Sequence, residues 1–297
     1  MRSGQSLLLF TALATANGFS LASAGAASIK PRAPPPLNVL PSVSTVAVAC
    51  IAPTCLGFWK SGYAVSYAYG GAMAAAAYIT LPHATGLGAA HAAALLFYGA
   101  RLNIFLLYRE LALDSSIHQM VNRPADLAAR LKRAPVVLGC AFLYFCMLAP
   151  LRVSVATGAA FAGPAAWAVK VAFAGFGLAA LGDTVKSIVK ARDGKDALVT
   201  VFPLNVLRHP NYTGECIGWA ASFAAAVLAA ASAGAVRAQA VWLGLSALGT
   251  VGIFFVLAGA ASSLEKKQAE RYKSSPEYAK WVASSWAGPV MKAAEGL

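Results

Sequence analysis

Long apolar runs, separated by short polar segments, recur along most of the chain. They predict seven helices, at residues 43–59, 63–81, 86–108, 134–156, 160–182, 213–235 and 239–262. A helix needs about 20 mostly apolar residues to cross the hydrocarbon core of a bilayer, and these runs are of that order. Alanine and glycine are abundant in them, and small residues let helix backbones approach closely in lipid. The pattern predicts an all-α polytopic membrane protein with six or seven transmembrane helices.

Residues 1–36 follow a different pattern, which predicts a leader and a proline-rich linker. A basic start is followed by an apolar stretch, a run of small residues and a second basic stretch: Arg2, Leu7 to Leu13, Leu21 to Ala24, Lys30 and Arg32. This order is typical of a cleavable signal peptide, and a leader without acidic residues also suits organelle import. The segment from Asn17 to Phe19 resembles the two-part plastid leaders of algae with secondary plastids. We expect delivery to a plastid membrane or the endoplasmic reticulum, and a single helical membrane domain at residues 37–297.

Composition agrees with a membrane protein and adds an orientation. Hydrophobic residues make up 59% of the chain and charged residues only 12%, about half the charged share of a soluble domain. Lys and Arg number 24 against 11 Asp and Glu, and they gather after the third, fifth and seventh predicted helices. Those three segments share one face if seven helices cross the membrane, and the positive-inside rule places that face toward the cytosol or stroma. Because membrane topology accounts for the basic residues, we expect no nucleic-acid partner.

The cysteines and histidines predict no metal site and no disulfide framework. The five cysteines are odd in number and lie in apolar stretches: Cys50, Cys55, Cys140, Cys146 and Cys216. The four histidines show no HxxxH or HxxE spacing: His83, His91, His118 and His209. We therefore expect the cysteines to pack as small, buried, apolar side chains.

The stretch from Arg208 to Glu215, RHPNYTGE, is the most distinctive in the chain. Pro210 cannot continue a helix from the loop before it, and Asn211 is a favoured N-cap, so a helix is expected to begin here. The free backbone N–H groups of such an end attract an anion, and Arg208 adds positive charge. Asn211 and Glu215 are four residues apart and share a face. The alternative is that Arg208 and His209 only anchor the helix at the lipid head groups while Glu215 caps it.

The third predicted helix has a polar face within the membrane. Tyr98, Arg101, Tyr108 and Arg109 fall within an arc of about 100° on a helix with 100° per residue. A charge at the centre of a membrane helix costs about 2.5–3.5 kcal/mol, so Arg101 should face protein or water. Two readings stay open: Arg101 or Arg109 binds a phosphate group, or Arg101 pairs with Asp183 or Glu215 for structure.

The stretch from Arg208 to Glu215 resembles the RHPNYxGE signature of the steroid 5-alpha-reductase C-terminal domain family. In many genomes this family is known only as a domain of unknown function. Further similar segments extend the resemblance to residues 95–290: Tyr98 to Leu102, Gly182 to Lys186 with Lys190, Leu264 to Lys267, Arg271 with Tyr272, and Pro276 to Tyr278. The chain departs from the family pattern at Val185, at residues 202–207 and at residues 284–289.

The resemblance implies a helical reductase that takes hydride from NADPH and delivers it to an activated carbon–carbon double bond of a lipid. It also implies a cofactor site around the signature. The residues expected to bind the cofactor are Arg101, Asp183, Lys186, Arg208, His209, Asn211, Tyr212 and Glu215. The chain has no GxGxxG turn between a strand and a helix, so a membrane cavity would hold the dinucleotide.

Reduction of an enone also needs an acid that polarises the carbonyl or protonates the adjacent carbon. Tyr63 and Tyr67 share a face of the second predicted helix, and Tyr98 lies on the polar face of the third. These three tyrosines are the candidate proton donors. Ordinary packing or an interfacial position would explain the pair on the second helix equally well.

Two other functions remain open. Isoprenylcysteine carboxyl methyltransferases look like distant relatives and carry a similar RHPxY turn that binds S-adenosylmethionine. In this chain Glu265 and Lys266 stand where those enzymes usually carry paired glutamates, and Asn211, Gly214 and Glu215 fit the reductase signature better. The third function is that of a noncatalytic membrane protein that kept the fold. The lipid substrate and the oligomeric state do not follow from the sequence.

Overall fold

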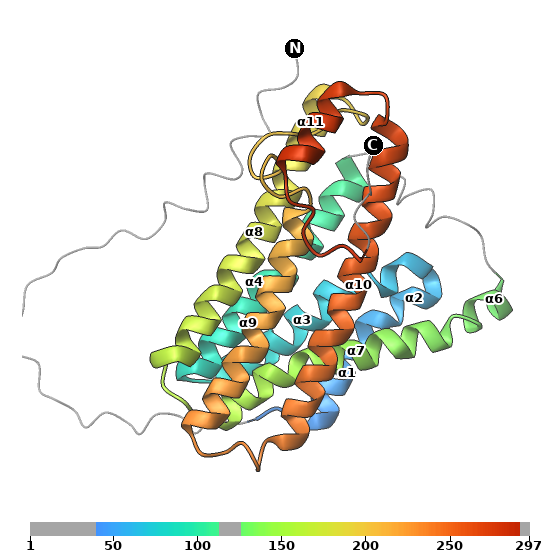
Figure 1. The fold of residues 1–297 in the computed structure, drawn as a ribbon. Coiled ribbons are helices and arrows are strands. Elements are labelled where there is room, and N and C mark those ends of the chain that lie inside the picture. Colours follow the sequence, from blue (N-terminus) through green and yellow to red (C-terminus); the bar gives the residue numbers. More distant parts are fainter. Residues whose placement is uncertain (1–39, 113–125, 292–297) are drawn as a thin grey trace, which may run out of the picture. The chain divides into compact units, whose positions relative to one another are not determined.

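A computed structural model describes residues 40–112 and 126–291, and helices make up most of this part of the chain (Figure 1). Within those ranges no β-strand forms, and Leu207 and Trp286 make an isolated parallel bridge. The all-α prediction is confirmed. The predicted leader at residues 1–36 lies outside the described residues.

Five helices of the described chain are long and apolar enough to cross a membrane. They are α4 (Gly86–Ala112), α7 (Ala134–Ala156), α8 (Gly163–Asp193), α9 (Pro210–Ser232) and α10 (Ala240–Tyr272). Each contains a window of 18 residues with a mean hydropathy of 1.4 or more and at most two charged residues. The protein is thus a polytopic helical membrane protein, as the apolar runs predicted.

The first two predicted helices are shorter and more broken than expected. Residues 43–83 form α1 (Val43–Thr54), α2 (Leu56–Trp59), η1 (Ser61–Ala64), α3 (Tyr67–Thr80) and η2 (Leu81–His83). Pro53 removes a backbone donor near the end of α1, and extended backbone at Lys60 separates α2 from η1. The six or seven predicted spans therefore divide into five long helices and these shorter apolar ones.

Basic segments gather at one end of the bundle. The loop between α8 and α9 and the chain after α10, which includes α11 (Pro276–Ser284), lie together at the end reached by the last turns of α8 and α10 (Figure 1). The Tyr272 hydroxyl donates to the carbonyls of Asp196 and Ala197, and Trp281 Nε1 donates to the Leu204 carbonyl at 2.7 Å. Two of the three basic segments thus share an end, as the sequence predicts. The side of the membrane that this end faces stays a prediction.

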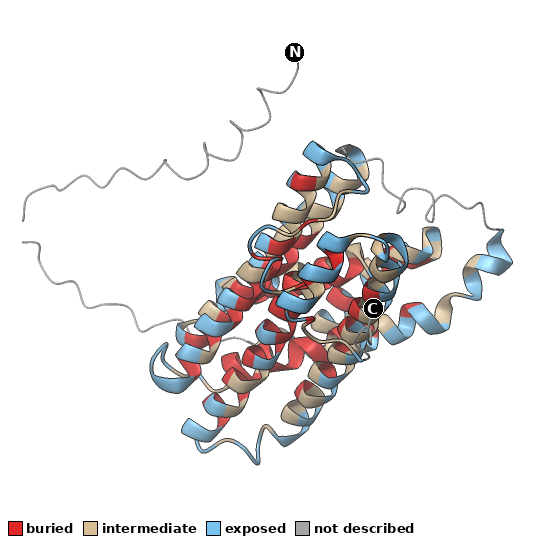
Figure 2. Cartoon of the chain, turned by 45° about the horizontal axis from the view of Figure 1, so that its top comes forward, coloured by how far each residue is buried: buried red, intermediate tan, exposed pale blue. Residues whose placement is uncertain are grey.

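Small residues set the contact between α8 and α9, which run side by side through the bundle. A Cβ added at Gly175 would lie 2.6 Å from the backbone N of Gly218 and 2.7 Å from the carbonyl O of Gly214. Glycine therefore allows the two backbones to touch, which is the usual way helices associate in lipid. Figure 2 shows the buried residues where the helices face one another.

Replacing Gly175 by alanine is expected to destabilise the protein by about 1–3 kcal/mol, the usual cost of overpacking a close contact. Gly177, on the same helix, is the matched control because a Cβ there meets no atom within 4 Å. Alanine at Gly177 should leave stability unchanged or raise it by up to about 1 kcal/mol through helix propensity. Chemical unfolding in detergent measures both variants. Equal stability of the two variants would contradict the close α8–α9 contact.

Candidate functional site

Three helices bring charged side chains together inside the bundle. Arg101 on α4 donates from Nη1 to Oδ2 of Asp183 on α8, at 2.8 Å. Its Nη2 lies 3.9 Å from Oε1 of Glu215 on α9. All three side chains are largely buried, with 12%, 14% and 8% of their surface exposed. The sequence left open whether Arg101 binds a phosphate group or pairs with Asp183 or Glu215. In the structure it pairs with both carboxylates.

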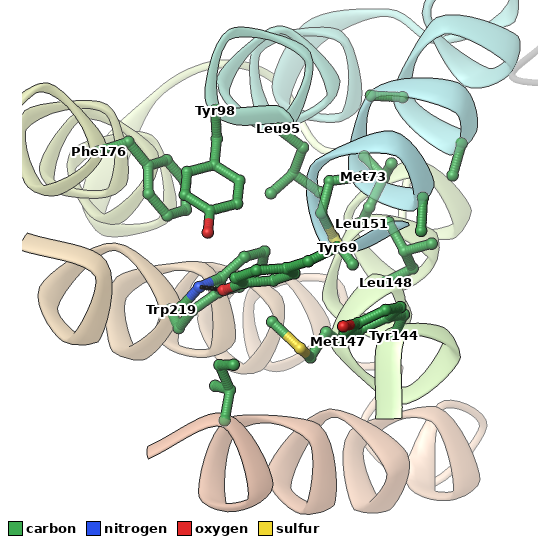
Figure 3. Close-up of a cluster of buried hydrophobic side chains, with 14 of the residues drawn as sticks. Tyr69, Met73, Leu95, Tyr98, Tyr144, Met147, Leu148, Leu151, Phe176 and Trp219 are labelled. Atoms are coloured by element: carbon green, nitrogen blue, oxygen red, sulfur yellow. Dashed lines mark hydrogen bonds between the residues drawn. The ribbon is translucent and has the colours of Figure 1, made fainter. Parts of the chain in front are cut away.

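Two phenols point at the same carboxylate. Tyr98 donates to Oε2 of Glu215 at 2.8 Å, and Tyr69 on α3 donates to the same oxygen at 3.2 Å. Trp219 Nε1 in turn donates to the Tyr69 hydroxyl at 2.7 Å (Figure 3). Phe176 packs against the rings of Tyr98 and Trp219. Glu215 therefore sits in a fixed position, with aromatic rings excluding water on one side.

Some donors of Arg101 have no partner. Its Nε and Nη2 atoms are buried, yet neither forms a hydrogen bond with any residue in the described ranges. The 3.9 Å separation between Nη2 and Glu215 Oε1 is too long for a hydrogen bond. Buried polar atoms nearly always have a partner, and an exception calls for an explanation such as a bound ligand. The hydroxyl oxygen of Thr213, in the first turn of α9, is unpartnered in the same way.

Further predicted residues surround this network. Lys186 and Arg109 interact electrostatically with Asp183, and Tyr212 interacts with Asp183, Glu215 and Arg109. Asn211 is half-buried in the first turn of α9. The expectation that Asn211 is the N-cap is wrong. The helix begins at Pro210 with His209 as the N-cap, because the fixed φ of proline suits the first helical position and its missing N–H costs nothing there.

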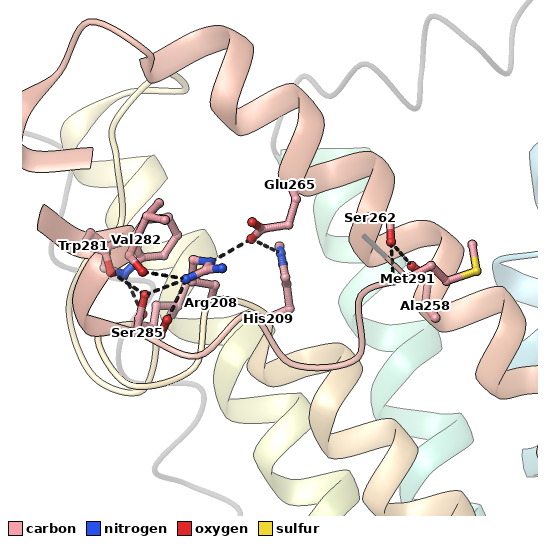
Figure 4. Close-up of polar contacts among 10 residues, drawn as sticks. Arg208, His209, Ala258, Ser262, Glu265, Trp281, Val282, Ser285 and Met291 are labelled. Atoms are coloured by element: carbon pink, nitrogen blue, oxygen red, sulfur yellow. Dashed lines mark hydrogen bonds and ion pairs between the residues drawn. The ribbon is translucent and has the colours of Figure 1, made fainter. Parts of the chain in front are cut away.

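Arg208 and His209 belong to a second network, centred on Glu265 (Figure 4). Arg208 Nε and His209 Nε2 both lie on Oε1 of Glu265, at 2.9 and 2.7 Å. Arg208 Nη1 also donates to the carbonyls of Val282 and Ser285, at 3.0 and 2.6 Å. These contacts tie the start of α9 to α10 and to the end of the chain. Contact of Arg208 and His209 with a cofactor stays a prediction.

Tyr63 and Tyr67 meet at a third network. Both donate to the carboxylate of Glu110 near the end of α4, Tyr67 at 2.7 Å, and Lys60 Nζ lies 3.4 Å from it. Burial raises the pKa of Tyr63, and the hydrogen bond with Tyr63 raises the pKa of Lys60. Glu110 is nine residues beyond Arg101, about 14 Å along the helix. The two tyrosines thus meet, but Tyr63 lies on η1 and Tyr67 on α3 rather than on one helix as predicted, and both lie apart from Tyr98.

Sequence reasoning missed Tyr69, Trp219 and Glu110. A signal existed for Glu110, because it is the first acidic residue of the chain and ends an apolar run. Tyr69 and Trp219 lie in apolar stretches that look like ordinary membrane helix, so only the hydrogen bonds that they form in the folded chain identify them. In the described part of the chain, no three His, Cys, Asp or Glu side chains are grouped so that they could hold a metal ion.

Comparison with known proteins identifies a family but no activity. The family model described as protein of unknown function (DUF1295) matches residues 59–285, a range that contains all three networks. No curated protein is significantly similar to the chain. No solved structure is significantly similar to it either. The match spans most of the 297 residues, so the chain belongs to the DUF1295 family of proteins of unknown function.

Proposed function

We propose that this protein is a membrane-embedded reductase that uses NADPH to reduce a carbon–carbon double bond of a lipid, such as a steroid, sterol or enoyl lipid, in a plastid or endoplasmic reticulum membrane. The observation that carries the proposal is the buried Arg101 with two unpartnered nitrogen atoms, next to the Tyr98–Glu215 pair. The resemblance of residues 208–215 to the reductase signature gives it independent support.

The residues present fit an anionic, oxygen-rich cofactor. The unpartnered Nε and Nη2 of Arg101 would each be satisfied by an acceptor oxygen, and Lys186 adds positive charge nearby. Asp183 holds Arg101 in place through the 2.8 Å ion pair. Asn211 and Tyr212 lie in the adjoining turn of α9. NADPH bound among these residues would supply the hydride.

Tyr98 is the proton donor that we propose among the three candidate tyrosines. Its phenol oxygen lies 2.8 Å from Glu215 Oε2, to which it donates, and Tyr98 is on the same helix as Arg101, one turn before it. The Tyr63 and Tyr67 hydroxyls instead donate to the carboxylate of Glu110, which is further along α4. In the reaction the single proton of Tyr98 would pass from its hydrogen bond with Glu215 to a substrate carbonyl, while Tyr69 continues to donate to the same Glu215 oxygen.

Isothermal titration of NADPH into the detergent-purified full chain tests the proposal, with S-adenosylmethionine as the parallel ligand. The variant Arg101→Lys keeps the charge beside Asp183 but loses the planar fork of donors. We expect wild type to bind NADPH and Arg101→Lys to bind it about 10 to 100 times more weakly, the worth of one or two charge-assisted hydrogen bonds. Arg237→Lys, at an exposed position between α9 and α10, is the control and should bind like wild type.

The other outcomes would replace the proposal. Binding of S-adenosylmethionine without NADPH would indicate a methyltransferase. If neither ligand binds to protein whose helicity and cooperative unfolding are intact, the result would indicate a noncatalytic relative. NADPH binding that Arg101→Lys leaves unchanged would place the cofactor away from the Arg101 network.

A further inference from the structure

A second polar site lies where the last turns of α8 and α10 meet the loop after α8. A pocket of about 140 Å³, open to solvent, is lined there by four cationic side chains: Lys186, Lys190, Lys267 and Arg271. Gln268 and Tyr272 line it too, whereas no Asp or Glu does. Lys186 is among the residues expected to bind the cofactor, whereas the other three cations have no role in the proposed reductase.

The backbone arranges the four cations in two converging pairs. Lys186 and Lys190 are four residues apart on α8, and Lys267 and Arg271 are four apart on α10, so each pair shares a helix face. The loop that completes the pocket is held to α10 by the Tyr272 hydroxyl, which donates to the carbonyls of Asp196 and Ala197 at 3.0 and 3.2 Å. The concave shape is therefore part of the fold.

The positive charges of the pocket are only partly balanced. Arg271 pairs with Asp196 at 2.9 Å, and Lys190 donates to a neutral acceptor, the carbonyl of Lys195. Lys267 makes no ion pair with any residue that the structure describes. Lys186 also interacts electrostatically with Asp183, so two carboxylates face the four cations and the pocket has room for about two negative charges.

An unpartnered acceptor lies among the cations. The side-chain oxygen of Gln268 is buried and has no hydrogen-bond donor in the described ranges. A simple inorganic anion such as chloride could not satisfy it. The complementary ligand is an anion that also carries an O–H group, either on itself or on the adjacent carbon.

We propose that this pocket binds a phosphomonoester. Such a group carries a charge of about −1.5 to −2 at pH 7, which matches the unbalanced lysines, and it is partly protonated so that its P–OH can donate to Gln268. The pocket lies at the ends of two membrane helices, where the phosphate of a lipid head group and that of a soluble metabolite are both available. A phosphomonoester at this position does not require the hydride chemistry proposed above.

Two probes with the same head group separate the two sources. Glycerol 3-phosphate is the soluble probe, measured by isothermal titration, and phosphatidic acid is the lipid probe, measured by native mass spectrometry against phosphatidylcholine. The variant Lys267→Gln removes one unpaired cation of the pocket, and its neighbour Lys266→Gln removes an exposed lysine that does not line it. Gln268→Leu removes the unpartnered acceptor. Both lysines are exposed, so neither lysine variant disturbs packing.

We expect Lys267→Gln to weaken binding about tenfold, the worth of one charge-assisted hydrogen bond, and Gln268→Leu to weaken it several-fold. Lys266→Gln should bind like wild type. If the variants show these effects with phosphatidic acid alone, the pocket binds a lipid head group. If they show them with both probes, the pocket binds phosphomonoesters of either source. Failure of both probes to bind folded protein, or equal affinity in the two lysine variants, would overturn the proposal.

Discussion

Replacing Glu265 by glutamine is expected to lower the free energy of unfolding by about 3 kcal/mol, because it leaves the buried Arg208 without a counter-charge. One carboxylate oxygen of Glu265 accepts from both Arg208 and His209, at 2.9 and 2.7 Å. Glutamine has the same shape, so the loss measures charge and hydrogen bonding rather than volume. Arg208 also holds the carbonyls of Val282 and Ser285, so the end of the chain should loosen together with the start of α9.

Glu270→Gln is the control for this change. Glu270 lies on the same helix, five residues further on, and is exposed, so its replacement should alter stability by less than about 0.5 kcal/mol. Chemical unfolding in detergent gives both free energies, and proteolysis near residue 285 reports the loosening of the end of the chain. If the two variants unfold alike, the Glu265 network does not anchor α9.

The lengths of α8 and α10 show where hydrophobic patterning stops being informative. Apolar runs predicted helices ending at residues 182 and 262, whereas the helices continue to Asp193 and Tyr272. The added turns are basic, and a helix that leaves the bilayer needs no apolar residues to continue. α8 ends only at Gly194, whose φ of 101° is a conformation that favours glycine.

The site could be predicted in part because polar residues are conspicuous in membrane helices. Arg101, Asp183 and Glu215 were each identified from sequence, and one of the two readings for Arg101 was the pairing that the structure contains. Tyr69 and Trp219 could not be found in this way. Their contact depends on where α3 and α9 lie within the bundle, in which α3 packs mainly on α4 and α9 mainly on α8.

The signature stretch divides between two networks, which sequence alone did not indicate. The chain changes direction where α9 begins at Pro210, so the side chains before this proline face Glu265 while Glu215 faces Arg101. Adjacent positions in a motif were expected to serve one site. In the folded chain, Arg208 and His209 hold α10 and the segment around Ser285, and the residues from Asn211 onward adjoin the proposed cofactor site.

Replacing Arg101 by glutamine is expected to lower the free energy of unfolding by about 3–5 kcal/mol, because two buried carboxylates then lose their shared cation. Asp183 lies 2.8 Å and Glu215 3.9 Å from the guanidinium, and both are largely buried. Arg101→Lys, which keeps the charge, should lose much less. The comparison therefore separates the structural role of the cation from the binding role that the planar fork of Arg101 is proposed to have.

The double variant Arg101→Gln with Asp183→Asn tests whether the pair accounts for the loss. Neutralising Asp183 removes one of the uncompensated charges, so the double variant should be more stable than Arg101→Gln alone, with a coupling energy of about 1–3 kcal/mol. Chemical unfolding of the four proteins of this cycle in one detergent gives the coupling. Because Glu215 still lacks the Arg101 cation in the double variant, the recovery should be incomplete. Additive losses from the two single variants would mean that Arg101 and Asp183 do not form the ion pair that joins α4 to α8.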